Sequence, residues 1–153
     1  MITTIVPESP ILRKYIEYYY IFNRETPSEL CYLAFPHYFT ALSFFKGVQI
    51  QRKDFVIEIA ESSGNQVQIE LLGKYINPVM IQYRGIIQEI SIVFKPFGLN
   101  RFLRENYHAI APDFSQEFHN EIWQQFGEKL FSRADDLNRL EEFLLSEFRE
   151  VDG

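Results

Sequence analysis

Residues 87–103 limit most strictly the folds open to this chain, because the period of the apolar residues changes there. In the first half apolar and polar residues alternate, which predicts a β-strand with Ile90, Ile92 and Phe94 on one face. Pro96 then removes a backbone donor, so the hydrogen-bond ladder of that strand ends. Apolar residues at helical spacing follow. The sequence therefore predicts a β-rich part before this junction and a helical part after it.

Short strands fill the part of the chain before the junction. A capping serine followed by proline, Ser9-Pro10, predicts a short helix first. Aromatic, β-branched or alternating runs then predict strands at residues 18–22, 31–35, 40–46, 48–52, 55–59, 67–71, 79–84 and 87–94. These strands lie too close together for helical crossovers, which favours an antiparallel barrel or sandwich of about seven or eight strands.

Turn residues between these strands predict hairpins. We expect them between 40–46 and 48–52, between 55–59 and 67–71, and between 79–84 and 87–94. Beyond the junction, apolar stripes at residues 122–130 and 137–148 predict two helices that form an antiparallel pair or a cover. The predicted fold class is α+β and mainly β, a single domain with its β part at residues 1–97 and its helical part at residues 98–153.

Net charge differs between the two parts of the chain. Residues 1–103 hold 10 Lys and Arg against 9 Asp and Glu, whereas residues 104–153 hold 5 against 12, so the charges are +1 and −7. An acidic surface repels phosphate, so this chain alone is not expected to bind DNA strongly. On the second predicted helix, Glu141, Glu142 and Glu147 are expected mainly on the side that faces water.

The compartment is predicted from what the sequence lacks. Cys31 is the single cysteine and excludes an internal disulfide, which favours a reducing compartment; we expect it to be a small buried hydrophobe. The first residues lack a basic leader before an apolar region, and no apolar run approaches the ~18 residues of a membrane helix. We expect a soluble cytoplasmic protein without a membrane partner.

The sequence carries no recognisable catalytic or cofactor motif. His37, His108 and His119 are scattered and are not paired at metal-ligand spacing. A phosphate-binding glycine loop, a nucleophile elbow and a dinucleotide fingerprint are all missing. We therefore expect no catalysis, no bound metal and no cofactor.

Aromatic residues make up 16% of the chain, and their rings and hydroxyls suit either a core or a small-molecule pocket. A histidine in the loop after Pro36 is placed to reach over the mouth of a barrel. The candidate ligand-binding residues are Tyr32, His37, Tyr38, Phe44 and Tyr83. For most of the tyrosines, core or interface packing remains the alternative, and for His37 the alternative is an ordinary surface position in a loop.

Four segments together resemble the N-terminal sensory domain of AraC-family transcription regulators. They are the opening around Leu12 and Tyr15, the run from Phe35-Pro36-His37 to Leu42-Ser43-Phe44, the turn Phe94-Lys95-Pro96-Phe97-Gly98 before a helix, and the helix containing residues 139–144. The turn is the most specific of them. Relatives commonly have a Phe-x-Pro-Gly-Gly type turn there, and Phe97 stands in place of the first glycine.

The resemblance implies a cupin-like β-barrel followed by helices that dimerise. It further implies an unknown small-molecule effector and a DNA-binding domain with helix-turn-helix motifs beyond residue 153, which this chain does not contain. DNA would be bound only through that domain. The candidate dimerisation residues are Leu140, Phe143, Leu144 and Phe148. Residues 94–98 become the expected coupling point between barrel and helices.

Two other classes of function stay open. One is a stand-alone cupin-like interaction module, which a fully packed interior would favour, whereas a cavity of a few hundred cubic ångströms would favour a sensor. The other is a small cupin-like enzyme, for which a metal bound by His37 and two further side chains would argue.

Overall fold

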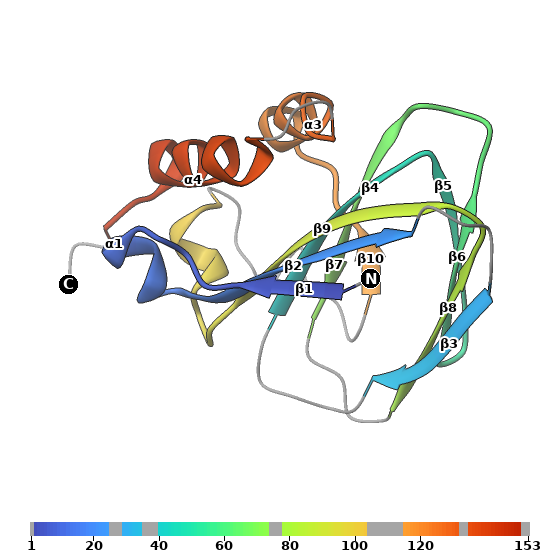
Figure 1. The fold of residues 1–153 in the computed structure, drawn as a ribbon. Coiled ribbons are helices and arrows are strands. Elements are labelled where there is room, and N and C mark those ends of the chain that lie inside the picture. Colours follow the sequence, from blue (N-terminus) through green and yellow to red (C-terminus); the bar gives the residue numbers. More distant parts are fainter. Residues whose placement is uncertain are drawn as a thin grey trace.

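The computed structural model describes residues 2–24, 29–34, 40–73, 78–103, 115–131 and 135–150. Its elements, labelled as in Figure 1, are β1 (Ile2–Ile5), α1 (Pro10–Arg13), β2 (Ile16–Arg24), β3 (Glu29–Ala34), β4 (Thr40–Lys46), β5 (Val48–Lys53), β6 (Val56–Glu61), β7 (Val67–Leu72), β8 (Val79–Arg84), β9 (Ile87–Phe94), the 3-10 helix η1 (Leu99–Arg101), β10 (Ser115–Glu117), α3 (Glu121–Gly127) and α4 (Asp136–Glu147). The described part is mainly β. Each of the eight predicted strands is present, with its bounds shifted by at most two residues, whereas β1 and β10 were not predicted.

The strands form two sheets that pack face to face (Figure 1). One has six strands in the order β1-β2-β9-β4-β7-β10, and the other has four in the order β3-β8-β6-β5. Neighbouring strands are antiparallel except β6 and β8, which run parallel and are connected through β7 of the other sheet. Neither sheet closes on itself. The structure thus shows two open sheets, and the cupin-like barrel expected from the sequence is not shown.

The six-stranded sheet is the middle layer of the described structure, because the helices cover its second face (Figure 1). In β9, Ile90, Ile92 and Phe94 point toward the helices and are buried, which confirms the predicted alternation. Ile87, at the start of β9, points to the opposite face and belongs to the core between the two sheets. Almost every residue of β9 is buried, so this strand serves two cores at once.

The three predicted hairpins are wrong. The strands of each pair, β4 with β5, β6 with β7 and β8 with β9, lie in different sheets. A short turn brings two strands together but does not determine whether they pair or pass to facing sheets. Gly47 and Gly85, with φ of 67° and 86°, turn two of these corners. The true hairpin is β5–β6, with Asp54 at φ 55° in its turn.

Short helices form where the sequence predicts them. The Ser9 hydroxyl accepts a hydrogen bond from the backbone of Leu12 at 3.3 Å and caps α1, and Asn120 caps α3 by accepting from the backbone of Trp123 at 3.1 Å. The predicted helix after the junction is only the single turn η1. In the described part of the chain, no helix combines the length and the apolar character needed to cross a membrane.

The sequence predicts that Glu141 on α4 faces mainly water. In the structure its carboxylate instead fastens α4 to the N-terminal part of the chain. Its carboxylate accepts hydrogen bonds from the backbone of Glu8 at 2.9 Å, from the backbone of Ser9 at 3.1 Å and from the Tyr19 hydroxyl at 3.0 Å. Sequence reasoning missed these bonds because their partners lie more than 120 residues away. One side chain thus joins α4, α1 and strand β2.

The junction after β9 is held against α1. The backbone N–H of Lys95 donates to the Tyr15 carbonyl at 2.9 Å, and its ammonium donates to the Arg13 carbonyl at 2.8 Å. Phe97 has a φ of 64°, in the left-handed region where a side chain is unfavourable, and is 81% exposed. The backbone conformation of this turn therefore suits glycine better than the phenylalanine that occupies it.

Replacing Phe97 by glycine is predicted to stabilise the protein. F97G and F97A both remove an exposed ring, but only glycine lacks the Cβ atom that makes the left-handed conformation unfavourable. We expect F97G to be more stable than F97A by about 1 kcal/mol, measured by urea unfolding followed by circular dichroism. Equal stability of the two variants would show that this turn is not strained.

Candidate functional site

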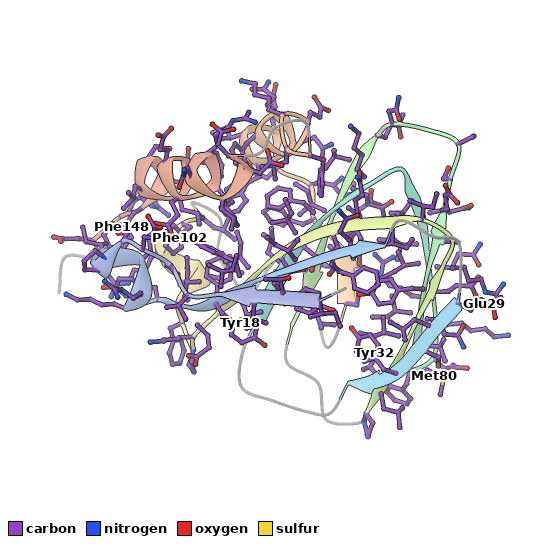
Figure 2. The ribbon with its side chains drawn as sticks, in the orientation of Figure 1. Tyr18, Glu29, Tyr32, Met80, Phe102 and Phe148 are labelled. Carbon is purple, nitrogen blue, oxygen red and sulfur yellow. The ribbon has the colours of Figure 1, made fainter. Side chains whose placement is uncertain are left out.

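A cavity of about 140 Å³ lies between the two sheets, and we call it the inter-sheet cavity. Side chains from both sheets line it: Tyr20, Tyr32, Ala41, Ser43, Phe45, Ile57, Ile59, Glu70, Leu72, Ile81, Tyr83, Glu89, Ser91, Val93 and Ser115. In Figure 2, Tyr32 lies on β3, on the side of the molecule away from Phe102 and Phe148 beside α1. The cavity is smaller than the few hundred cubic ångströms of a drug-sized site, but a cavity of ~150 Å³ holds benzene.

A buried carboxylate forms the polar centre of the cavity wall. Glu89 on β9 is 5% exposed and accepts hydrogen bonds from the Tyr83 hydroxyl and from the Ser91 hydroxyl, both at 2.7 Å. The Ser91 hydroxyl is also 2.6 Å from that of Ser43 on the neighbouring strand β4. The residues thus form one connected network from two sheets, with Tyr83 on β8 reaching across to β9.

Burial governs the protonation of this network. It raises the pKa of Glu89, because a charged carboxylate loses its hydration, while the hydrogen bonds from Ser91, Tyr83 and Ser43 favour the charged form and oppose that shift. Burial, with the nearby Glu89 charge as a smaller cause, also raises the pKa of Tyr20 and of Tyr83. The hydroxyls of these two tyrosines therefore stay protonated at neutral pH and remain available as hydrogen-bond donors.

Aromatic rings make up much of the remaining wall. The Tyr83 ring stacks on Phe22 with ring centroids 4.7 Å apart and lies 6.0 Å from the Tyr32 ring. Tyr20 belongs to the same cluster of partly or fully buried rings. The cavity wall therefore combines aromatic rings with a carboxylate and several hydroxyls, a composition typical of small-molecule sites.

A second acid in the wall has its own cationic partner. Glu70 on β7 forms an ion pair with the Arg52 guanidinium and accepts a hydrogen bond from the Ser115 hydroxyl at 3.0 Å. Arg52 also donates to that hydroxyl at 3.1 Å. The three residues come from β5, β7 and β10, so the ion pair ties the edges of the two sheets together. Its role is at least partly structural.

The structure brings together two of the five candidate ligand residues. Tyr32 and Tyr83 both line the inter-sheet cavity. Phe44 points to the other face of its sheet, where its ring lies 6.2 Å from that of Trp123. His37 and Tyr38 lie outside the described residues. A ligand-binding role for these five residues stays a prediction.

Sequence reasoning missed the most buried polar residues of the site, Glu89, Ser91, Ser43 and Glu70. The alternation in β9 placed Glu89 and Ser91 on one face, but the polar face of an antiparallel strand usually meets water. Only the second sheet, which packs over this face, reveals that it is buried. The available signal was a glutamate and a serine two residues apart in a strand otherwise rich in apolar residues.

The four candidate dimerisation residues pack inside the chain. Leu140 and Leu144 have no exposed surface. The Phe143 ring stacks on Phe126 at 4.1 Å, and the Phe148 ring lies 5.3 Å from that of Tyr15. These contacts join α4 to the rest of the helical layer, and a role in dimerisation stays a prediction.

The described cysteine and histidine, Cys31 and His119, lie apart from any group of side chains that could hold a metal. Cys31 is exposed, so the prediction that it is a buried hydrophobe is wrong. It lies on β3, an edge strand of the four-stranded sheet. Within the described ranges, no three His, Cys, Asp or Glu side chains come together as a possible metal site.

Comparison with known proteins identifies a family that the chain matches. Residues 4–114 match the model of a family described as a domain of unknown function, DUF6597. This segment runs from β1 past η1, and the strand β10 and the helices α3 and α4 follow it. No curated protein and no solved structure matches the chain.

Replacing Glu89 by glutamine is predicted to change how stability depends on pH. Because the folded state holds the Glu89 proton more tightly than the unfolded state, the wild-type protein loses stability as the pH rises above the ordinary glutamate pKa of 4.5. E89Q cannot ionise, so its stability relative to wild type should increase with pH over that range. Urea unfolding at a series of pH values measures this difference.

The matched control is E142Q, which neutralises an exposed glutamate on α4. Its pH dependence should follow that of the wild type. A stability difference between E89Q and wild type that is constant with pH would contradict the raised pKa of Glu89.

Proposed function

The chain belongs to the DUF6597 family, described only as domains of unknown function, and we propose that it is a ligand-sensing domain of an AraC-type transcription regulator. In this proposal it has no catalytic activity of its own. A small molecule binds in the inter-sheet cavity, and the regulator binds DNA through a C-terminal domain that is not part of this chain. The homodimer and the cytoplasmic location belong to the same proposal.

One observation carries the sensing part of this proposal. Strand β9 places Glu89, Ser91 and Val93 in the wall of the cavity and turns Ile90 and Ile92 to the helical layer. The neighbouring strands β4 and β7 divide their side chains in the same way. A structural change on the cavity face is therefore separated from the packing of α3 and α4 by a single sheet.

The mechanism would be a shift between two arrangements of sheet and helices. A ligand that binds one arrangement better stabilises it by the difference of its two affinities, typically ~1 to 3 kcal/mol. The helical layer would pass this preference on through α4, which is held to β2 by the bond between Tyr19 and Glu141. We further propose that the two open sheets are a variant of the cupin-like fold, and the resemblance in sequence supports this.

The single tryptophan provides a reporter for this mechanism. Trp123 on α3 is buried on the helical face of the six-stranded sheet, with its ring 5.0 Å from that of Phe143 on α4. It does not line the cavity. A ligand in the cavity changes its emission only if the helical layer responds.

We predict a saturable change in Trp123 emission when small polar solutes are screened, with amines, sugars and carboxylates as the probes. A41L should abolish the response, because Ala41 lines the cavity and a leucine there fills it. The matched control is A60L, which adds the same volume on β6 between the inward-facing Ile59 and the exposed Glu61. A60L should respond like the wild type.

Two results would contradict the proposal in different ways. If no probe changes the emission, or if A41L responds as the wild type does, the cavity is not a sensing site, and a stand-alone interaction module becomes the better account. If cross-linking and immunoprecipitation of the native gene product recover no discrete DNA sites, the transcriptional part fails and the sensing part is unaffected. Turnover of a probe by the wild type would favour the small enzyme.

A further inference from the structure

We infer that the inter-sheet cavity binds a small primary amine in its ammonium form, with the Glu89 carboxylate as its counter-ion. This inference rests on the proposed function, since it names the class of ligand that the sensing cavity takes. It follows from the charge, the aromatic wall and the size of the cavity.

Charge gives the first argument. Of the two acids in the wall, Glu70 is paired with Arg52, whereas Glu89 is bonded by hydroxyl groups. None of the described residues that line the cavity is Lys, Arg or His. A buried carboxylate without a cationic partner is unfavourable, and a bound cation supplies that partner. The negative charge of the Glu89 carboxylate would repel an anionic ligand.

The aromatic wall gives the second argument. Tyr20, Tyr32 and Tyr83 line the same cavity as Glu89, and a cation is attracted to the electron-rich face of such rings. The hydroxyls of these residues provide acceptors for the remaining N–H groups of an ammonium ion, which has three donors. Ile57, Ile59 and Ile81 complete the wall and suit an apolar body attached to the amine.

Size gives the third argument. A volume of about 140 Å³ accepts a ligand not much larger than benzene. Large polyamines and peptides are too big to be enclosed in this volume. A single amino group on a short aliphatic chain or on one ring satisfies both the charge and the volume.

Three probes of nearly equal shape test the inference: benzylamine, benzyl alcohol and benzoate. Isothermal titration calorimetry measures their binding without depending on any response of the helices. We expect benzylamine to bind at least about tenfold more tightly than benzyl alcohol, because it forms charge-assisted hydrogen bonds, and we expect no binding of benzoate.

The variant E89Q should lose this preference and bind benzylamine about as weakly as benzyl alcohol. Its retained binding of benzyl alcohol shows that the cavity is still formed. E142Q, with an exposed carboxylate changed in the same way, should keep the wild-type preference. A41L should bind none of the probes.

Wild-type protein provides a second test that needs no variant. Benzylamine affinity should rise as the pH increases above the ordinary glutamate pKa of 4.5, because binding requires the ionised Glu89, whose pKa burial raises. Among the described residues, the other titratable groups facing the cavity are Glu70 on β7, Tyr20 on β2, Tyr32 on β3 and Tyr83 on β8. A pH dependence that persists in E89Q would assign the effect to one of these groups and overturn the inference.

The remaining outcomes separate the inference from the proposed function. If benzyl alcohol or benzoate binds as tightly as benzylamine, and A41L abolishes that binding, the cavity is a ligand site but the amine preference is wrong. If benzylamine binds with the expected preference and Trp123 emission does not change, the amine site stands and the sensing function fails. If none of the three probes binds, the inference is overturned.

Discussion

Strand β9 is buried on both faces, and the arrangement of the described structure depends on it. Its apolar face packs against the helical layer through Ile90, Ile92 and Phe94, and its other face lies under the four-stranded sheet. An antiparallel strand commonly keeps one face in water. Here seven of its eight residues are buried, so a buried polar side chain on β9 needs a partner inside the protein. Glu89 and Ser91 find theirs in Tyr83 and in each other.

Because both faces of the six-stranded sheet are covered, the cavity and the helices pack against the same strands from opposite sides. The helices cannot leave the six-stranded sheet without exposing its apolar face, and Glu141 holds α4 through three hydrogen bonds to distant residues. The four-stranded sheet cannot move without disturbing the network of Glu89. Ligand and helices thus act on opposite faces of one sheet, which is the physical basis of the proposed sensing function.

Local features of this fold could be predicted from the sequence, and pairings could not. Aromatic, β-branched or alternating runs located eight of the ten strands in the described residues, and Ser9-Pro10 marked the start of α1. The hairpin predictions were wrong because a turn at Gly47 or Gly85 has the same sequence whether the chain stays in one sheet or crosses to the other. Two cavity residues, Tyr32 and Tyr83, were among the candidates because aromatic hydroxyls suit pockets, whereas Glu89 was not, because its burial depends on a second sheet.

Nuclear magnetic resonance of the backbone amides tests most directly whether the sheet connects the cavity to the helices. Benzylamine is titrated into the protein, and the amide of Ser91 in the cavity wall is compared with those of Leu140 and Leu144 on α4. The account predicts that all three signals shift and saturate at the same benzylamine concentration, and that A41L abolishes these shifts. A shift confined to the cavity strands, with the α4 signals unmoved, would contradict it.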